Sequence, residues 1–510
     1  MLVHQLFDDA LARTPEKCAL VFEGRRLSYR QLHRLSDALA VLLQRNGLRR
    51  GDRVAVMLEN SAEFVVSLIG ILKAGGVLMP VNPLTRPAKL AYLLQDAEAV
   101  ALITQRSLAE CFEPALARSA ALRLCVVVGG SEGLSAAPLY LPFPDETDPE
   151  GRAPLPAHSI DQDLASLIYT SGSTGEPKGV MLTHANMVAA VRSVLGYLPL
   201  QEADVVFSVL PMAFSYGLYQ AILCLTVGCR LVLERSFAFP AQALALMIGE
   251  RATVFPGVPS IFAILTGLHS LQDHALGTVR ILTSAAAALP VETIARLRRA
   301  FPNARIFSMY GMTECKRISF LPPEDIDVRP ASVGKGMPNQ DHWLVDDQGC
   351  RLAGPAVGEL VVRGSHVMLG YWKKPLQTAQ RLRPGMLPGQ SVLHTGDLFR
   401  QDADGYLYFV ARKDDIIMTR GEKVSPREVE DALHELDGVL EAAVIGVPDP
   451  ILGQAVKAFV VLKQGCAYEK RSVVRHCLGR LEAYMVPKHV EFVPDLPKTD
   501  SGKIRKIDLS

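Results

Sequence analysis

The sequence predicts an α/β protein with a large N-terminal domain and a small α+β C-terminal domain. Through most of the first 260 residues, apolar runs typical of strands alternate with segments of helical period, which predicts doubly wound parallel sheets. The chain has 510 residues, too many for a single hydrophobic core. After residue 332 short strands separated by Gly, Pro and Asp predict a small, barrel-like β subdomain.

The first α/β subdomain is expected to end before residue 129. Apolar residues at helical spacing predict helices over 2–11, 32–42, 62–73 and 87–96. Runs of apolar and β-branched residues predict strands over 19–22, 54–58, 77–81 and 99–104. Residues 129–163 are rich in Pro, Gly and acidic residues without any period, so we expect a surface connection there.

The same alternation returns after residue 163 and predicts a second α/β subdomain. We expect helices over 186–195, 217–225 and 240–250, and strands over 205–211, 230–234 and 252–258. Past residue 412 the pattern resembles βαββαβ, with two helices over 426–436 and 471–481. The inward residues expected on these two helices are Val429, Leu433, Leu436, Val474, Leu478 and Leu481.

Composition excludes several classes of protein. The formal charge is +1, so no basic field indicates nucleic acid or an anionic membrane. Nine scattered cysteines without a CxxC pair predict reduced thiols, and neither a zinc site nor a disulfide framework. The N-terminus has aspartates where a signal peptide needs an apolar run, and the longest apolar stretches are too short to span a bilayer. We therefore expect a cytoplasmic protein without an integral membrane segment.

One stretch, IYTSGSTGEPKGV at 168–180, predicts a phosphate-binding loop. An apolar strand leads into small and hydroxyl residues, and a lysine follows. These loop residues are Thr170, Ser171, Gly172, Ser173, Thr174, Gly175 and Lys178. Glycines let backbone N–H groups approach an anion, hydroxyls add donors, and the lysine adds a charge. The pattern is not a Walker loop, which needs Gly where Pro177 stands, and a Gly/Ser linker would lack the strand and the Pro-Lys-Gly exit.

Four further stretches carry residues suited to nucleotide chemistry. MYGMTE at 309–314 offers an aromatic face for a base at Tyr310, a hydroxyl for a phosphate at Thr313 and a carboxylate for Mg²⁺ at Glu314. HTGDL at 394–398 places Asp397 where it could accept from both ribose hydroxyls. ARKDDIIMTRGEKVSPREVE at 411–430 and PKTDSGKIRKIDL at 497–509 follow, the latter with Lys503. Each stretch alone is a weak signal.

Together and in this order, these stretches resemble the adenylate-forming superfamily of acyl-CoA synthetases, peptide-synthetase adenylation domains and beetle luciferase. The resemblance runs from AGGVLMPVNP at 74–83 to Lys503. It implies that a substrate carboxylate attacks the α-phosphorus of ATP and expels pyrophosphate, after which a thiol takes the acyl group. Charge neutralisation and positioning would supply the catalysis.

The resemblance also implies roles for single residues. The loop from Thr170 to Lys178 would hold the β and γ phosphates, Thr313 would bond a phosphate oxygen and Glu314 would ligate Mg²⁺. Tyr310 would stack on adenine, while Asp397 and Arg412 would hold the ribose. Lys503 would reach the α-phosphate, Gly421 would line the thiol tunnel and Asp414 would be the hinge. The implied domains are 1–411 for adenylation, 412–414 for the hinge and 415–510 for a mobile C-terminal domain.

The resemblance places the acyl pocket around one set of residues. These are Phe214, Ser215, Val258, Ser284, Ala285, Ala286 and Met312. Amino-acid-activating relatives carry aspartate where this chain has Ser215, so an α-ammonium would lack a partner and an α-amino acid is disfavoured. Lys316 and Arg317 are unusual after the metal carboxylate. They would form a solvated face or ion pair, or contact an acidic group of the substrate or of a carrier.

The resulting hypothesis is an AMP-forming carboxylate–thiol ligase that uses ATP, Mg²⁺ and coenzyme A. The alternative acceptor is the phosphopantetheine arm of an acyl or peptidyl carrier protein, which has the same thiol end. A non-catalytic binding protein would be expected to lose Lys178, Thr313, Glu314, Asp397 or Lys503, and all five are present. A luciferase-like oxidase shares the scaffold, but no residue indicates its special substrate.

Overall fold

The structure is a computed structural model that describes residues 1–134, 138–145, 153–170, 177–268, 276–285, 289–419, 422–449, 452–481, 483–499 and 503–509. The chain forms two compact units. Unit 1 contains Met1–Asp341 and Arg363–Leu393, and unit 2 contains His342–Val362 and His394–Ser510. Within the described residues, no helix combines the length and apolar character needed to cross a bilayer.

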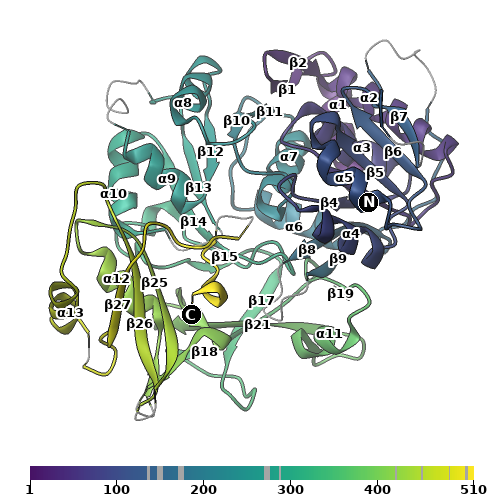
Figure 1. Cartoon of the computed structure of the whole chain (residues 1–510). Helices are drawn as coiled ribbons and strands as arrows, with labels where there is room; N and C mark the ends of the chain where they lie inside the picture. The colour runs from purple at the N-terminus through teal and green to yellow at the C-terminus, as the bar shows by residue number, and fades with distance from the viewer. Residues whose placement is uncertain are drawn as a thin grey trace. The chain divides into compact units, whose positions relative to one another are not determined.

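The first sheet of unit 1 has eight strands in the order β19-β9-β8-β4-β3-β5-β6-β7 (Figure 1). Its strands are β3 (Arg53–Met57), β4 (Val77–Pro80), β5 (Ala101–Gln105), β6 (Leu124–Val128), β7 (Leu139–Pro142), β8 (Leu164–Thr170), β9 (Lys178–Thr183) and β19 (Gly370–Tyr371). The central strands are parallel and buried along nearly their whole length, as expected for strands covered on both faces. β9 pairs antiparallel with both of its neighbours, β8 and β19.

Three of the helices near this sheet begin at a side-chain cap. The helices are α2 (Tyr29–Arg45), α3 (Ala62–Lys73), α4 (Pro87–Asp96), α5 (Ala109–Leu116) and α6 (His184–Leu195), preceded by η1 (Val3–Phe7) and α1 (Asp8–Arg13). The hydroxyls of Ser28, Ser61 and Thr183 accept backbone N–H groups in the first turns of α2, α3 and α6. Leu90 and Phe112, on α4 and α5, pack with strand residues in one buried cluster.

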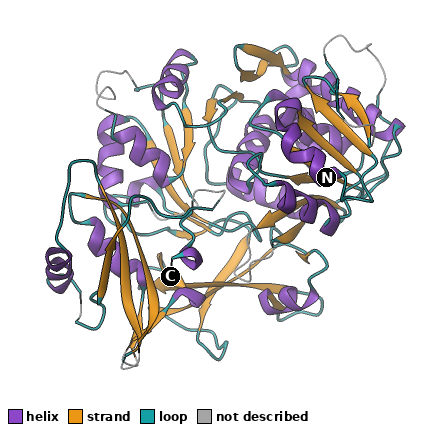
Figure 2. Cartoon of the chain, viewed as in Figure 1, coloured by secondary structure: helices purple, strands orange, loops and turns teal. Residues whose placement is uncertain are grey.

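The second sheet of unit 1 has nine strands in the order β16-β15-β14-β13-β12-β10-β11-β1-β2. They are β1 (Cys18–Phe22), β2 (Arg25–Ser28), β10 (Val205–Ser208), β11 (Arg230–Leu233), β12 (Val254–Gly257), β13 (Ile281–Ser284), β14 (Arg305–Tyr310), β15 (Ser319–Phe320) and β16 (Lys335–Gly336). The accompanying helices are α7 (Ser215–Val227), α8 (Pro240–Gly249), α9 (Pro259–Thr266) and α10 (Val291–Ala300). Figure 2 shows these helices beside the strands.

Most elements of unit 1 lie where the sequence predicts them, and the helices over 62–73 and 87–96 agree to the residue. Two predictions need correction. The predicted helix over 2–11 is a 3₁₀ turn followed by α1. The connection over 129–163 contains β7, which pairs in parallel with β6 and extends the sheet at its edge. A four-residue edge strand has too few buried residues to leave a clear pattern in the sequence.

A β-rich segment follows, with β17 (Gln340–Val345), β18 (Ala356–Gly364), α11 (Pro375–Arg381), β20 (Leu382–Pro384), β21 (Ser391–Gln401) and β22 (Leu407–Arg412). Its strand order is β17-β18-β21-β20, and β22 pairs with β21. The division between the two compact units falls inside this segment, within β17, β18 and β21. The functional boundary expected at residues 412–414 concerns motion, and it stays a prediction.

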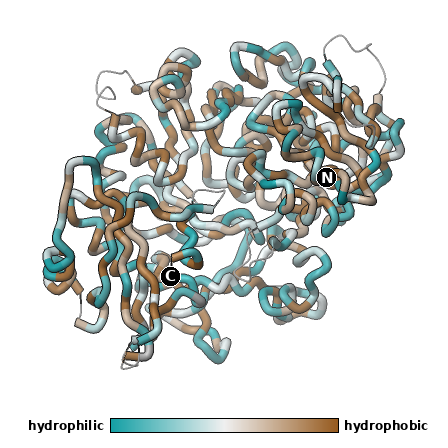
Figure 3. The backbone as a smooth tube through the Cα atoms, viewed as in Figure 1, coloured by the Kyte–Doolittle hydropathy of each residue, from teal (hydrophilic) through white to brown (hydrophobic). Residues whose placement is uncertain are grey.

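The C-terminal part of unit 2 has a second β-sheet, in the order β24-β23-β26-β25 with β27 beside β26. Its elements are β23 (Ile417–Thr419), β24 (Glu422–Val424), α12 (Pro426–His434), β25 (Val439–Asp449), β26 (Gly453–Leu462), α13 (Lys470–Leu478) and β27 (His489–Phe492). Figure 3 shows hydrophobic residues along β25 and β26. On α13 the expected inward residue Leu478 is 56% exposed, and Val473 and Cys477 are buried instead. The expected residues Val474 and Leu481 are partly buried against the same core, so the prediction fails at Leu478 alone.

Candidate active site

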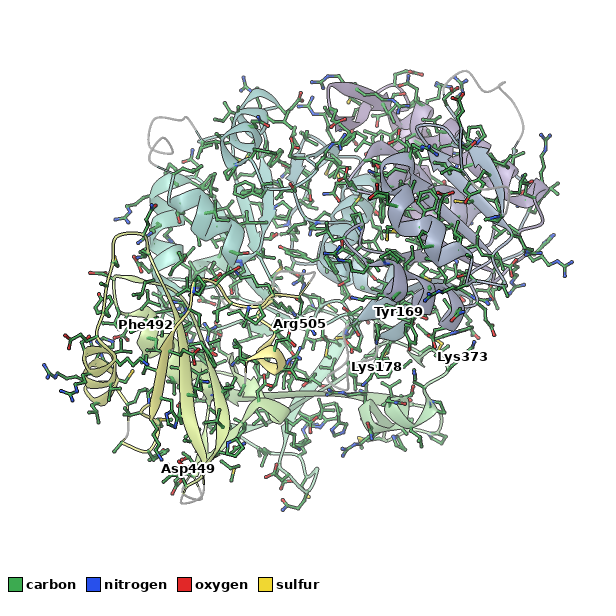
Figure 4. The ribbon with its side chains drawn as sticks, viewed as in Figure 1. Tyr169, Lys178, Lys373, Asp449, Phe492 and Arg505 are labelled. Carbon is green, nitrogen blue, oxygen red and sulfur yellow. The ribbon has the colours of Figure 1, made fainter. Side chains whose placement is uncertain are left out.

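The predicted phosphate loop connects the two strands of a β-hairpin. β8 and β9 are antiparallel, and their last pair is Thr170 with Lys178. The loop residues Ser171, Gly172, Ser173, Thr174 and Gly175 lie outside the described residues. At the hairpin end, where Figure 4 labels Tyr169 and Lys178, the Tyr169 hydroxyl donates to Asp96 Oδ2 at 2.5 Å. Burial and Asp96 raise the pKa of Tyr169 well above its ordinary value, so its hydroxyl stays a donor.

Tyr371 connects the lysine of this hairpin to the predicted metal carboxylate. The two-residue strand β19 pairs with β9 and brings the Tyr371 ring to 5.8 Å from Lys178 Nζ. The Tyr371 hydroxyl donates to Glu314 Oε1 at 2.8 Å, and both side chains are buried. Burial, followed by the Glu314 charge, raises the pKa of Tyr371 far above its ordinary value. Tyr371 was not predicted as a site residue, because a tyrosine in the stretch GYW carries no local functional signal.

The predicted acyl-pocket residues follow the carboxyl ends of parallel strands. β10, β12, β13 and β14 run in parallel, with Gly257, Ser284 and Ser308 in register across three of them. Phe214 and Ser215 open α7 after β10, Val258 precedes α9 after β12, Ala285 follows β13, and Met312 follows β14. Ligands of open α/β sheets bind at this edge. Ala286 lies outside the described residues.

A closed turn after β14 presents Tyr310, Thr313 and Glu314. A Cβ atom on Gly311 would lie 2.4 Å from the Lys316 carbonyl oxygen, so only glycine fits there. Lys316 has φ +62°, and Ile318 N–H donates to the Tyr310 carbonyl at 2.9 Å. The turn therefore returns the chain to β15, which pairs antiparallel with β14. Glu314 is 8% exposed.

Lys316 and Arg317 are buried, so a solvated charged face at these positions is excluded. Their exposures are 5% and 3%. Lys316 Nζ donates to the Ser215 carbonyl at 3.2 Å and lies 4.5 Å from the centre of the Tyr219 ring. Burial, and then the Arg317 charge, hold the pKa of Lys316 well below its ordinary value. Burying the Lys316 ammonium beside Ser215, the first residue of α7, therefore costs free energy.

The two predicted ribose ligands lie together in unit 2. Asp397 on β21 pairs across the ladder with Arg412 on β22, and Arg412 Nε is 3.9 Å from Asp397 Oδ1. The Thr395 hydroxyl accepts the Asp397 N–H at 3.1 Å. Arg412 is 60% exposed and Asp397 13%, so the carboxylate is the more firmly placed of the two.

Glu359 supports the turn that carries Asp397, and sequence reasoning missed it. Its carboxylate accepts the Gly396 N–H at 3.0 Å and faces His394 Nδ1 at 3.6 Å and Lys413 Nζ at 3.4 Å. Burial opposes its ionisation, but the contacts with His394 and Gly396 and the charge of Lys413 hold the pKa of Glu359 at about 2. Glu359 lies within the strand GELVVRG, where one acid amid apolar residues was the only available signal.

The remaining predicted residues also belong to unit 2. Lys503 is exposed and follows a turn in which Thr499 N–H donates to the Lys503 carbonyl and the Lys503 N–H donates to Thr499 Oγ1 at 3.1 Å. Asp414 lies in the short 3₁₀ turn η5 (Lys413–Asp415) that follows β22. Gly421 lies outside the described residues. The approach of Lys503 to the phosphate loop, and a rotation at Asp414, stay predictions.

Comparisons with known proteins bear on this arrangement. Residues 7–372 match the family described as AMP-binding enzyme, and residues 428–503 match the AMP-binding enzyme C-terminal domain. The chain is 34% identical to a long-chain-fatty-acid–CoA ligase of Bacillus subtilis (strain 168), over 98% of this chain and 93% of that protein. Among solved structures, the anthranilate CoA ligase AuaEII in complex with anthranoyl-AMP has a TM-score of 0.90 at 31% identity, covering 100% of this chain and 96% of that one. ATP-bound MatB from Rhodopseudomonas palustris has a TM-score of 0.87 at 30% identity, covering 100% and 98%.

The fold and the site define an enzyme that activates carboxylic acids with ATP as acyl-adenylates. The chain belongs to the AMP-binding enzyme family, with both its main and its C-terminal domain, and is an AMP-forming acid–thiol ligase.

Proposed function

We propose that this enzyme joins a carboxylic acid to the thiol of coenzyme A in two half-reactions that consume Mg-ATP. The observation that carries the proposal is the contact series Lys178, Tyr371, Glu314, which links the hairpin loop to the turn after β14. This series supports the proposal that Lys178 and the buried Glu314 carboxylate act on the same triphosphate.

In the first half-reaction, a substrate carboxylate oxygen attacks the α-phosphorus of ATP, and the bond to the bridging oxygen breaks to release pyrophosphate. The hairpin loop and Lys178 would hold the β and γ phosphates, and Thr313 would donate to a phosphate oxygen. Tyr310, at the end of β14, would stack on adenine, and the Asp397–Arg412 pair would hold the ribose. Lys503 would place a cation near the α-phosphate, where it neutralises charge that develops in the transition state.

Glu314 suits a magnesium ion that is held mainly by the nucleotide. Mg²⁺ usually takes one or two carboxylates together with phosphate oxygens and water. Among the described residues no group of three or more His, Cys, Asp or Glu side chains could enclose a metal, so a single carboxylate fits this mode. When bound, the ion would neutralise phosphate charge, while Tyr371 keeps one oxygen of Glu314 in place.

In the second half-reaction, the thiol attacks the acyl carbon, AMP leaves, and a thioester forms. We propose a rotation of the C-terminal domain about Asp414 that withdraws Lys503 and brings Gly421 to the thiol tunnel. Coenzyme A is proposed as the acceptor because relatives along nearly the whole chain are named CoA ligases. We also propose that the enzyme is cytoplasmic. All nine cysteines are free thiols, which supports a reducing compartment.

The test is product analysis with the full-length enzyme, ATP, Mg²⁺ and a panel of carboxylic acids. Pyrophosphate release that depends on the acid, followed by acyl-CoA detected by mass spectrometry at low enzyme concentration, is the expected result. Acyl-adenylate without acyl-CoA, together with loading of a phosphopantetheinylated carrier protein, would reassign the acceptor. Absence of acid-dependent pyrophosphate release with every acid would overturn the proposal, and Glu314→Gln serves as the inactive reference.

A further inference from the structure

We propose that the acid activated by this enzyme carries a second acidic group, which the Lys316 ammonium binds at the carboxyl edge of the β10–β14 sheet. The inference rests on the proposed function, because it places the acyl chain beside Ser215. It adds a substrate class, carboxylic acids with a further carboxylate, which neither the fold nor the family determines.

The first argument is the unused hydrogen-bonding capacity of Lys316. An ammonium has three N–H donors. Among the described residues, the only hydrogen bond of Lys316 Nζ is to the Ser215 carbonyl, at 3.2 Å. The Tyr216 and Tyr219 rings, at 5.2 and 4.5 Å, offer a favourable π-face but accept no conventional hydrogen bond. Two donors therefore remain for a ligand.

The second argument is missing countercharge. Neither Lys316 nor Arg317 has a carboxylate within 4.0 Å among the residues that the structure describes, and Arg317 Nε is buried without a partner. Lys73 shows how this chain treats another buried lysine: it is 9% exposed and pairs with Asp37 at 2.7 Å. Since a buried cation normally has such a partner, an adjacent pair of cations without one indicates a place for an external anion.

The third argument is location. Ser215 opens α7 directly after β10, and the Tyr216 hydroxyl donates to the Thr283 carbonyl at 3.0 Å, next to Ser284. The ammonium therefore lies beside residues that follow or end strands β10 and β13, at the carboxyl edge where ligands of open α/β sheets bind. A carboxylate is an acceptor that suits its free donors.

The occupant could in principle be a nucleotide phosphate, which is also anionic. Lys316, however, contacts the start of α7, whereas the predicted metal ligand Glu314 contacts Tyr371. The structure therefore favours the acyl substrate. The charge of Lys316 disfavours an α-amino acid, because the substrate ammonium would meet a second cation. It also disfavours an unbranched fatty acid, because the alkyl chain would cover Lys316 without supplying an anion.

The experiment compares matched pairs of acids in a pyrophosphate-release assay. The pairs are straight-chain monoacids against α,ω-diacids of three to eight carbons, and benzoate against its three carboxy-substituted forms. We expect at least one diacid to exceed its monoacid partner in kcat/KM by at least about tenfold. Lys316→Met should lower kcat/KM for that diacid by roughly a hundredfold and raise it for the monoacid, while the KM for ATP moves less than the KM for the diacid.

Two further variants and a control make the test decisive. Lys316→Gln should lose the preference as Lys316→Met does, and Lys316→Arg should retain most of it. Lys470→Met, at an exposed lysine that begins α13, should leave the preference intact. Thermal unfolding confirms that each variant folds. The inference would be overturned if the wild type preferred monoacids or if the Lys316→Met and Lys316→Gln variants kept the diacid preference; the proposed adenylation would not be affected. A larger effect on the KM for ATP than on the KM for the diacid would also overturn it and assign Lys316 to the nucleotide. No pyrophosphate release with any acid would instead overturn the proposed function.

Discussion

At the scale of single residues, Tyr371 holds one oxygen of Glu314 and places its ring beside Lys178. A carboxylate that is 8% exposed needs such a donor, because burial without one is costly. The hydroxyl contacts Oε1 of Glu314, and Oε2 is the oxygen proposed to ligate Mg²⁺. If Glu314 ligates Mg²⁺ as proposed, Tyr371 positions that ligand, and its removal is expected to change the response to the metal.

The variant Tyr371→Phe should weaken the response of the enzyme to Mg²⁺. Removing the hydroxyl frees the orientation of Glu314, and lost support of a metal ligand typically costs about 10- to 100-fold in metal affinity or activity. Initial rates of pyrophosphate release, measured across magnesium concentrations, should show a raised half-saturation value. Tyr408→Phe is the matched control, because it removes a hydroxyl donated to Asp402 at 3.0 Å in unit 2. Equal magnesium dependence in both variants would refute the role of Tyr371.

Glu359 gives a prediction about pH. Its pKa is held at about 2, below the ordinary 4.5, so the ionised form stabilises the folded state. That contribution is complete above about pH 4.5 and is lost as the pH falls toward 2. Glu359→Gln should therefore lower the free energy of unfolding by roughly 1–3 kcal/mol at pH 7, and the difference from wild type should shrink at pH 3.

Urea unfolding at the two pH values measures this difference. Glu435→Gln is the control, since its ion pair with Arg480 at 2.7 Å is about half exposed and is expected to contribute less than about 1 kcal/mol. A Glu359→Gln difference that is constant from pH 7 to pH 3 would show that the charge of Glu359 does not stabilise the turn at Asp397.

At the scale of elements, the turn between β14 and β15 gathers the residues predicted to bind the nucleotide and the two buried cations. It closes through backbone contacts from Tyr310 to Ile318, and its geometry depends on the missing side chain at Gly311. Several predicted site residues thereby share a segment of eight residues after one strand. A small change in its backbone should disturb Thr313, Glu314 and Lys316 together.

Gly311→Ala should distort this turn, because the added Cβ would meet the backbone of Lys316 at 2.4 Å and of Arg317 at 2.8 Å. Backbone cannot yield as a flexible side chain does, so we expect a loss of roughly 1–3 kcal/mol in stability and a greater relative loss of adenylation. Gly249→Ala, at the end of α8 where a Cβ would meet no atom within 4 Å, is the control. Thermal unfolding and pyrophosphate release measure the two effects. Equal stability and equal activity of the two variants would contradict the prediction.

At the scale of the whole molecule, the predicted groups are divided between two compact units. The hairpin, the turn after β14 and the pocket residues belong to unit 1, whereas Asp397, Arg412 and Lys503 belong to unit 2. An enzyme of this kind can supply a cation for one half-reaction and withdraw it for the next if the part that carries Lys503 moves.

Lys503→Ala tests this separation of roles. A cation about 4 Å from developing charge is worth roughly 4 kcal/mol at an effective dielectric near 20, so we expect adenylation to fall by about two to three orders of magnitude. Thioester formation from a supplied acyl-adenylate should be retained, because Lys503 would then be withdrawn. Single-turnover assays of each half-reaction measure both, with Lys470→Met as the surface control. Equal loss in the two assays would refute the two-role assignment.

By itself, the sequence determined the family, the α/β alternation and the positions of the loop, the MYGMTE turn and the Asp397–Arg412 pair. Local spacing carries all of these, because period, turn residues and short functional stretches lie within a few residues of one another. The individual catalytic roles remain predictions.

Only the tertiary structure decided which distant residues meet. Tyr371 and Glu314 are 57 positions apart, Glu359 and Gly396 are 37 apart, and Lys316 and Ser215 are 101 apart. No local pattern specifies such contacts, since they depend on strand pairing and on where each strand ends. For the same reason the burial of Lys316 and Arg317, which the sequence alone left undecided, follows from the packing of the β14 turn against α7.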